Sequence, residues 1–463
     1  MTNFPRIILA GLSGGSGKTF VSAGLIRALS RRGLRVQPFK KGPDYIDASW
    51  LSHAARAKAC NLDPFLLTPE VLCALFQEKA AGADISIIEG NRGLFDGKDR
   101  EGTCSTAELA RQLDAPVVLV LDATKMTRTA AAIVAGCRAF EPGLNLAGVI
   151  LNRTAGERHR AILKDCIENL ANVPVLGALP KVAENPIPER HMGLVSDQEH
   201  AGREQALDAM ADIVEQWVDI ERVLDIAGNA LAPAPAPPVP WPAPVVTGEG
   251  PVIGYVFDAA LWFYYPENLE ALQHAGARLT PVSLLSNEPW PELHGLYLGG
   301  GFPETQAQAL AANNAVRERV RGLALAGLPI YAECGGFMYL CAGLTLDDGE
   351  HALAGVFPLV TRLCPRPQGL GYVEALVEAE NPFHLLGARL TGHEFHYSAC
   401  LEPSNPYALP ATALRMLRGR GMLNGRDGLV SNNTFAAYTH IHALGTPHWA
   451  PNFVRAAEAY RQK

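Results

Sequence analysis

A proline-rich segment near the middle of the chain constrains the fold more than any other feature. Residues 233–244 read PAPAPPVPWPAP, with seven prolines in twelve positions. Proline fixes φ and lacks an amide donor, so this segment cannot join a sheet and should run as polyproline II. A chain of 463 residues also exceeds one ordinary hydrophobic core. We therefore predict two domains, 1–228 and 249–463, joined by a Pro-rich linker over 229–248.

Short apolar runs alternate with helical stretches on both sides of this linker. The predicted strands include RIILAGL, RVQPFK, ISIIEG, PVVLVLDA and LAGVILN before it, and PVIGYVF, HGLYLGG and LPIYAECGG after it. Helices are predicted over 19–32, 127–140, 266–275 and 304–326. Such alternation predicts parallel sheets covered by helices. The expected fold class is α/β, with two doubly wound domains.

Composition narrows the functional classes. Hydrophobic residues make up 48% and charged residues 19%, and no apolar run reaches the roughly 18 residues of a membrane helix. A formal net charge of -7 argues against a nucleic-acid binder. Nine cysteines without paired spacing, and no export signal, predict reduced thiols in the cytoplasm. We expect small-molecule chemistry, with neither nucleic acid nor membrane as a partner.

The stretch GLSGGSGKT, Gly11 to Thr19, is a P-loop expanded by one residue. An apolar strand enters it and a helix with an apolar stripe leaves it, which is the context that a P-loop requires. Lys18 is predicted to hold the β- and γ-phosphates of ATP, and Thr19 a Mg²⁺ ion. A glycine-rich turn without a ligand is the alternative. The backbone amides predicted to face the phosphates are those of Gly14, Gly15, Ser16 and Gly17.

Charged side chains lie near the ends of two further predicted strands. Lys40 ends RVQPFK, Asp44 and Asp47 lie in the loop after it, and Glu89 ends ISIIE. Carboxylate oxygens are the ligands that Mg²⁺ prefers. Asp44 and Glu89 are therefore predicted magnesium ligands together with Thr19, and Lys40 a nucleotide ligand. Taken singly, each acid is as often a helix cap or a surface charge.

The stretch LPIYAECGGFMYL repeats the strand, turn and helix pattern around a cysteine. Cys334 lies at the turn among small residues, which is typical of a nucleophile elbow. A helix N-terminus and a histidine are expected to lower its thiol pKa well below about 8.5. FAAYTHIHALG supplies His440 as the predicted general base. A structural cysteine is the alternative.

Each half resembles a known group of enzymes. The expanded loop is similar to that of dethiobiotin synthetase-like ATPases, relatives of the partitioning ATPases, whose synthetase members phosphorylate a substrate carboxylate. This resemblance implies that Asn152, in VILNRT, contacts the adenine of ATP. Cys334 and His440 resemble the catalytic pair of class I, or triad-type, glutamine amidotransferases. That resemblance implies an oxyanion hole at the backbone of Gly300 and Gly301, in LYLGGGFPE.

The third member of the triad departs from the usual pattern. Many triad amidotransferases carry His-x-Glu, whereas this chain reads His440-Ile441-His442. His442, another acid such as Glu394, or no residue at all could orient His440.

Taken in order, the motifs of both halves resemble the cobyrinic acid a,c-diamide synthase family, in which a dethiobiotin synthetase-like ATPase is fused to a glutaminase. The resemblance runs from about Arg6 to about His448 through GLSGGSGKT, KKGPDYID, EGNRGLFDG, VILNR, YLGGGFPE, YAECGG, GHEFHYS and YTHIH. It implies that ATP phosphorylates the a and c acetate carboxylates of cobyrinic acid in cobalamin biosynthesis. Ammonia released from glutamine at Cys334 would then displace the phosphate. A homodimer is compatible with this reading.

The resemblance also implies contacts with the tetrapyrrole. EGNRG stands where the family leads us to expect Glu-Gly-Val-Met-Gly, and Lys41 replaces a neutral residue. Arg92 can pair with an additional carboxylate, which leaves hydrogenobyrinic acid and nickel-sirohydrochlorin as alternative acceptors, or it is a solvated loop charge. The predicted substrate contacts are Tyr45, Asp47, Arg92, His393, Glu394, His396 and Tyr397.

The sequence leaves two rival functions open. A partitioning-type ATPase switch usually carries an additional signature lysine early in the loop, and Gly11 to Ser16 contain none. A pseudo-amidotransferase that uses free ammonia is the second rival. Cys334 and His440 argue against it, whereas the missing acid of His-x-Glu leaves it open.

Overall fold

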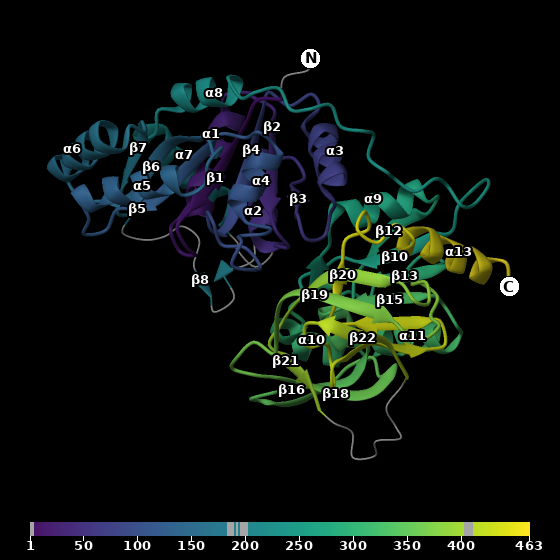
Figure 1. The fold of residues 1–463 in the computed structure, drawn as a ribbon. Helices are drawn as coiled ribbons and strands as arrows, with labels where there is room; N and C mark the ends of the chain where they lie inside the picture. Colours follow the sequence, from purple (N-terminus) through teal and green to yellow (C-terminus); the bar gives the residue numbers. More distant parts are fainter. Residues whose placement is uncertain (1–3, 183–188, 191–192, 195–201, 402–410) are drawn as a thin grey trace. The chain divides into compact units, whose positions relative to one another are not determined.

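A computed structural model describes residues 4–182, 189–190, 193–194, 202–401 and 411–463. Contacts divide the chain into two compact units, Met1–Val239 and Pro240–Lys463, and both are α/β, as predicted (Figure 1). The division falls within the proline-rich segment, and residues 231–251 form neither helix nor strand. No helix in the described part of the chain has the length and apolar character that crossing a membrane requires.

The first unit is built on a seven-stranded sheet with the order β3-β2-β4-β1-β5-β6-β7. Every pair of neighbouring strands is parallel, so the carboxyl ends of all the strands lie at one edge. Loops that leave β1, β2, β4 and β6 therefore meet there. The strands are β1 (Arg6–Gly11), β2 (Val36–Lys41), β3 (Cys60–Leu62), β4 (Ile85–Gly93), β5 (Val117–Asp122), β6 (Leu146–Thr154) and β7 (Val175–Pro180).

Helices bury the sheet of the first unit. Ile7 and Leu9 of β1 belong to a core shared with α1, α2, α7 and α8, and α7 lies along α1 in Figure 1. Arg27 of α1 binds Glu204 and Asp208 of α7, each at 2.8 Å. The helices are α1 (Lys18–Arg31), α2 (Ile46–Ala55), α3 (Pro69–Ala80), α4 (Thr106–Gln112), α5 (Arg128–Phe140), α6 (Glu157–Cys166), α7 (Arg203–Trp217) and α8 (Ile220–Gly228).

The second unit contains a ten-stranded mixed sheet with the order β12-β10-β13-β15-β24-β23-β22-β19-β20-β25. The part from β12 to β24 is parallel, as predicted, and the part from β24 to β25 is antiparallel and was not predicted. Its strands are β10 (Val252–Val256), β12 (Arg278–Val282), β13 (Gly295–Leu298), β15 (Ile330–Glu333), β19 (Gly369–Val377), β20 (Arg389–His396), β22 (Ala411–Arg418), β23 (Arg426–Ser431), β24 (Thr434–Ala437) and β25 (His440–Ile441).

Smaller elements complete the second unit. Its helices are α9 (Pro266–His274), α10 (Ala307–Ala312), α11 (Asn314–Leu325), α12 (Gly335–Leu340) and α13 (Trp449–Arg461). β11 (Leu261–Phe263) pairs with β14 (Gly300–Gly301). A four-stranded sheet contains β16 (Cys341–Leu346), β17 (Gly349–Ala352), β18 (Phe357–Leu363) and β21 (Ser398–Cys400).

The single helix predicted over 304–326 is wrong. The segment is divided into a 3₁₀ turn, Pro303–Gln306, followed by α10 and α11. The break falls at Asn313, whose ψ of 67° is not helical and whose Nδ2 donates to the carbonyl of Leu284 at 3.0 Å. This tertiary hydrogen bond compensates for the interruption of the helix.

His384 is a buried histidine of the second unit, and its burial leads us to predict that acid destabilises the fold. Burial, followed by the neighbouring His448, lowers the pKa of His384 to about 3, and its side chain is buried against Tyr331. The unfolded state therefore takes up this proton first, and stability is lost as the pH falls from about 6.5 toward about 3. Lowering the pH from 7 to 5 should therefore reduce the free energy of unfolding by about 2 kcal/mol through this group.

His384→Gln should remove most of that loss, because glutamine does not titrate. Urea unfolding at pH 7 and pH 5 measures the difference, with the exposed His274→Gln as the control. An equal pH-dependent loss in wild type and both variants would show that His384 does not carry the effect.

Candidate functional site

The loop between β1 and α1 is packed so closely that glycine is required in it. Gly15 and Gly17 have φ values of 72° and 89°, in the left-handed region that favours glycine. A Cβ atom on Gly11 would lie 2.3 Å from Ser16 Oγ. One on Gly17 would lie 2.1 Å from Asn152 Nδ2. Positive φ values or close contacts thus favour glycine at Gly11, Gly15 and Gly17, in the segment that ends at the N-terminus of α1.

Asn152 lies near the end of β6 and holds this loop. Its Nδ2 donates to the carbonyl of Ser16 at 3.0 Å, and its Oδ1 accepts from the amide of Arg153 at 2.9 Å. The side chain is buried. Contact with adenine stays a prediction for Asn152, and the structure adds a positioning contact that the sequence did not predict.

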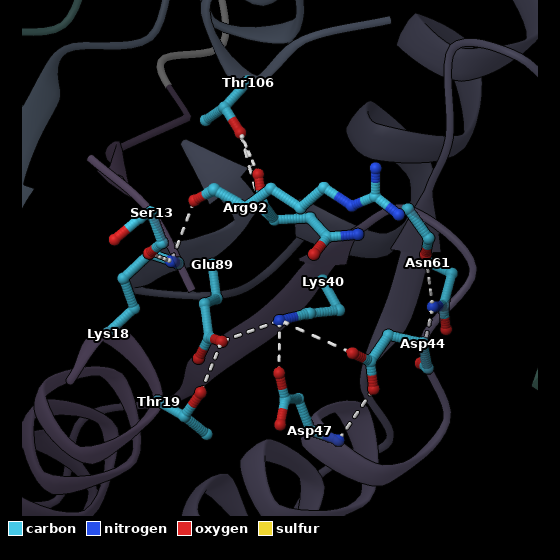
Figure 2. A network of polar contacts seen from close by, with 12 residues as sticks. Ser13, Lys18, Thr19, Lys40, Asp44, Asp47, Asn61, Glu89, Arg92 and Thr106 are labelled. Carbon is cyan, nitrogen blue, oxygen red and sulfur yellow. Dashed lines mark hydrogen bonds and ion pairs between the residues drawn. The ribbon is translucent and has the colours of Figure 1, made fainter. Parts of the chain in front are cut away.

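Lys18 connects the loop to the end of β4. Its Nζ donates to the carbonyls of Ser13 and Arg92, both at 2.9 Å (Figure 2). Burial lowers the pKa of Lys18, and the charge of Glu89 opposes that effect. Arg92 has a φ of 53° and an exposed side chain. The backbone turn at Arg92 thus presents its carbonyl to the P-loop lysine.

Lys40 lies at the centre of a cluster of carboxylates. Figure 2 shows its Nζ between Asp47 at 2.5 Å, Glu89 at 2.7 Å and Asp44 at 3.9 Å. Its side chain is only 2% exposed, and burial alone would lower its pKa. The charges of Asp47 and Glu89 outweigh burial and raise the pKa of Lys40, so this ammonium group is charged at neutral pH.

The three acids of this cluster differ in their pKa values. Burial, followed by repulsion from Asp47, raises the pKa of Asp44 to about 7. Burial also raises the pKa of Glu89, whereas for Asp47 the charge of Lys40 outweighs burial and lowers the pKa. Of the three acids, Asp47 is therefore the one whose ionised form its surroundings favour.

The predicted magnesium ligands offer oxygen atoms only. Thr19 Oγ1 donates to Glu89 Oε1 at 2.9 Å, and the buried Glu89 Oε2 has no hydrogen-bond partner in the described part of the protein. Among the described residues, no group of three or more His, Cys, Asp or Glu side chains forms a metal cage. Mg²⁺ is usually held by one or two carboxylates together with substrate phosphates, so these residues fit an ion that arrives with the nucleotide.

Asn61 of β3 is a positioning residue that the sequence did not reveal. Its Nδ2 donates to the carbonyls of Gly42 and Asp44, both at 2.9 Å, and it is 2% exposed. It thereby fixes the loop that carries Asp44. A single asparagine after a short apolar run has no sequence signal that separates it from a turn residue.

Tyr45, a predicted substrate contact, is the residue before α2 and is half-buried.

A cleft of about 700 Å³ is lined by the end of β4, the segment that follows it and the end of α5. Its lining includes the exposed Arg92, Arg100, and the rings of Phe95 and Phe140. These two rings pack edge to face with centroids 4.8 Å apart. The same lining contains the carboxyl groups of Asp96, Asp99, Glu101 and Glu141, and Arg100 is paired with Glu101 at 3.0 Å. The cleft therefore combines an aromatic surface with charges of both signs, and Arg92 also presents its carbonyl to Lys18.

Cys334 in the second unit lies between β15 and α12. Its φ and ψ of 46° and -101° are rare for any residue except glycine, as expected of a nucleophile elbow. The amide of Cys334 donates to the carbonyl of Ala437 on the neighbouring β24 at 2.7 Å. Its Sγ lies 3.8 Å from the carbonyl of Phe395.

The predicted lowering of the thiol pKa is wrong. Burial, followed by the charge of Glu304, raises the pKa of Cys334, and the amide of Gly335 lowers it by less. The helix that follows has only six residues, and the side chain of Cys334 is 5% exposed. The resting group is therefore a neutral thiol, which requires a base during the reaction.

His440 and the predicted oxyanion glycines lie close together. β15 and β24 are parallel neighbours in which Glu333 is opposite Ala437, so Cys334 and His440 both follow the carboxyl ends of adjacent strands. A Cβ atom on Gly300 would lie 2.5 Å from His440 Cε1. One on Gly335 would lie 2.9 Å from the amide nitrogen of Gly301. The glycine turn is thus in contact with the imidazole and the elbow.

The two named candidates for the third triad member have other partners. His442 Nε2 is 3.7 Å from Glu267 Oε2. The carboxylate of Glu394 accepts from the amides of Arg420 at 2.7 Å and Gly421 at 3.0 Å. The carboxylate that faces His440 Nδ1 is instead Glu333, at 3.4 Å.

The remaining predicted substrate contacts belong to β20 or follow it. The ring of His393 stacks on that of His440, with centroids 4.7 Å apart and planes 12° apart, and burial lowers the pKa of His393 well below its usual value. His396 Nδ1 is 2.8 Å from the carbonyl of Ser398, and Tyr397 is half-buried. His393 thus belongs to the surroundings of His440. Contacts of His393, Glu394, His396 and Tyr397 with a tetrapyrrole stay predictions.

Comparison with known proteins assigns a family to each unit. Residues 7–195 match the CobQ/CobB/MinD/ParA nucleotide binding domain, and residues 252–448 match the CobB/CobQ-like glutamine amidotransferase domain. The two matches contain the P-loop and Cys334, respectively.

Similarity to curated proteins extends over nearly the whole chain. A cobyrinate a,c-diamide synthase of Magnetococcus marinus is 42% identical over 455 residues, which cover 97% of each protein. Those of Syntrophotalea carbinolica and Salmonella typhimurium are 43% and 39% identical, and the alignments cover 97% of this chain and 98% and 97% of the relatives. The chain therefore belongs to the cobyrinate a,c-diamide synthase family of glutamine amidotransferase-containing ligases.

Proposed function

We propose that the protein uses ATP and glutamine to amidate the a and c acetate carboxylates of cobyrinic acid through acyl phosphate intermediates. The names of its relatives support the acceptor. The observation that carries the mechanism is the hydrogen bond from Lys18 Nζ to the carbonyl of Arg92, a residue that also lines the cleft. Arg92 thus connects the P-loop lysine with the cleft in which the acceptor is proposed to bind.

The first step is phosphoryl transfer. A carboxylate oxygen of the acceptor attacks the γ-phosphorus, the bond to the bridging oxygen of ADP breaks, and an acyl phosphate forms. The P-loop amides and Lys18 neutralise charge on the phosphates, and the charged Lys40 adds to that field. Thr19, Asp44 and Glu89 would hold Mg²⁺, which screens the negative charge of the phosphates when bound.

The second unit supplies the nitrogen. The thiol of Cys334 gives its proton to His440, and the sulfur attacks the side-chain carbonyl carbon of glutamine. The backbone amides of Gly300 and Gly301 would bind the oxyanion. Ammonia leaves with a proton returned by His440, and water then hydrolyses the glutamyl thioester to glutamate and free thiol. The ammonia displaces phosphate from the acyl phosphate, and the cycle repeats on the second carboxylate.

The cleft supports a macrocyclic polycarboxylate as the acceptor. Phe95 and Phe140 offer apolar surface to the ring, and the exposed Arg92 can pair with a peripheral carboxylate. The lining also carries four acidic residues, so this support rests on the two rings and on Arg92. Because Arg92 can pair with an additional carboxylate, hydrogenobyrinic acid and nickel-sirohydrochlorin are the alternative acceptors. We propose a cytoplasmic location, which the use of ATP and nine free cysteines support.

Transfer of ¹⁸O from the acceptor tests the acyl phosphate. With ¹⁸O-labelled carboxylates, each amide formed should send one ¹⁸O atom into inorganic phosphate, because the carboxylate oxygen that attacked phosphorus leaves with it. Mass spectrometry of the phosphate measures this transfer. Label in AMP would indicate an acyl adenylate instead, and phosphate without any ¹⁸O would indicate that water, rather than the carboxylate, attacks the γ-phosphorus.

A further inference from the structure

A buried carboxylate lies against the nitrogen of His440 that faces away from Gly300. Glu333 Oε2 is 3.4 Å from His440 Nδ1, and the two side chains are 1% and 2% exposed. The same carboxylate accepts from the hydroxyl of Tyr297 at 3.1 Å and from the amide of Ile441 at 3.2 Å. Two donors besides the imidazole therefore hold the carboxylate in place.

We propose that Glu333 is the positioning residue of His440 and takes the place of the acid that His-x-Glu provides in other triad amidotransferases. By accepting from Nδ1–H, Glu333 leaves Nε2 without a proton, ready to receive the proton of Cys334. The inference rests on the proposed role of the second unit as a glutaminase.

The position of Glu333 in the chain suits this role. Glu333 is the last residue of β15, and Cys334 follows it directly at the elbow. Successive side chains of a strand point to opposite sides, and the φ of 46° at Cys334 departs from strand geometry at this point. Two consecutive residues thus supply the nucleophile and the orienting carboxylate. His440 on β25 accepts the proton of the first and is oriented by the second.

Three other titratable side chains considered for this site, His393, His442 and Glu394, have surroundings of their own. The ring that stacks on His440 belongs to His393, which burial keeps neutral. His442 Nε2 lies 3.7 Å from Glu267 Oε2, and the carboxylate of Glu394 accepts from the amides of Arg420 and Gly421. Glu333 Oε2, by contrast, lies 3.4 Å from His440 Nδ1.

Activation of Cys334 moves one proton and forms one bond to sulfur. The S–H bond of Cys334 breaks, its proton moves to Nε2 of His440, and the sulfur forms a bond to the carbonyl carbon of glutamine. The imidazolium then carries protons on both nitrogens, and Glu333 stabilises it through the Nδ1–H hydrogen bond without taking that proton. Because the resting thiol is neutral, the whole activation depends on this transfer.

Glu333→Gln tests the proposal, with Glu267→Gln as the matched control. Both substitutions replace a buried carboxylate that faces a histidine, but only Glu333 faces His440. We expect Glu333→Gln to lower kcat for glutamine hydrolysis by about 10³-fold, with little change in KM, because the amide group can donate to Nδ1 and select the wrong tautomer. Glu267→Gln should stay within about tenfold of wild type, and both variants should keep ammonia-dependent amidation.

The tautomer of His440 provides an independent readout without glutamine or acceptor. In ¹⁵N spectra of the imidazole, wild type should carry the neutral proton on Nδ1, and Glu333→Gln should move it to Nε2. Wild type with the proton on Nε2, or equal losses of hydrolysis in the two variants, would overturn the proposal even if Glu333→Gln folds poorly. A wild-type protein that amidates no acceptor would overturn the proposed function and leave the tautomer result standing.

Discussion

Cys334→Ala should abolish amidation with glutamine and leave amidation with ammonia unchanged. The thiol forms the glutamyl thioester, and no other side chain at the elbow can replace it, so the glutamine-dependent rate should fall by about 10³-fold or more. Ammonia reaches the acyl phosphate without this step. Amide formation on the acceptor, followed with each nitrogen donor in turn, measures both rates.

Cys341→Ala is the matched control for Cys334→Ala. Cys341 is a second buried thiol of the same unit, at the start of β16, and its Sγ contacts the carbonyl of Phe337 at 3.5 Å. The control should keep both donors. If Cys334→Ala still used glutamine at a rate near that of wild type, the thioester mechanism would be wrong.

Lys18→Met should abolish amidation with either donor. Its ammonium group neutralises the β- and γ-phosphates at the moment of transfer, and the loss of one such preorganised charge lowers phosphoryl-transfer rates by about 10³-fold. Methionine keeps the length and most of the volume of the buried side chain. The same assay with glutamine and with ammonia measures the effect, and nucleotide binding by calorimetry separates binding from turnover.

Lys164→Met controls for the loss of a lysine that is exposed on α6. It should leave both rates unchanged. Together, the variants of Cys334 and Lys18 separate the two units: the first should lose one donor and the second should lose both. Ammonia-dependent amidation within tenfold of wild type in Lys18→Met would contradict the role of the P-loop.

Motifs that depend on neighbouring residues could be predicted from the sequence. The P-loop and the elbow around Cys334 each need a buried strand, small residues at a turn and a following helix, all within about 25 residues of chain. Lys40 and Glu89 could be expected to meet because parallel strands end at one edge of the sheet. The structure brings them to 2.7 Å.

Features that arise from tertiary packing could not be predicted in this way. Glu333 and His440 are far apart in sequence, and the acid before a nucleophile carries no pattern of its own. The thiol pKa of Cys334 was predicted from a helix N-terminus, but burial has the larger effect. The break at Asn313 depends on a carbonyl of Leu284, which local propensity does not register.

Transfer of the amide nitrogen of glutamine to the macrocycle is the reaction that the two units are proposed to carry out together. The purified protein is incubated with ATP, Mg²⁺ and glutamine labelled with ¹⁵N in its side-chain amide, and cobyrinic acid, hydrogenobyrinic acid and nickel-sirohydrochlorin are offered separately. Mass spectrometry then counts the amides on each product and the labelled nitrogen in them. We predict two successive amidations of cobyrinic acid, both labelled. ATP hydrolysis without amide formation on any of the three acceptors would show that the protein is not an amidating ligase for these macrocycles.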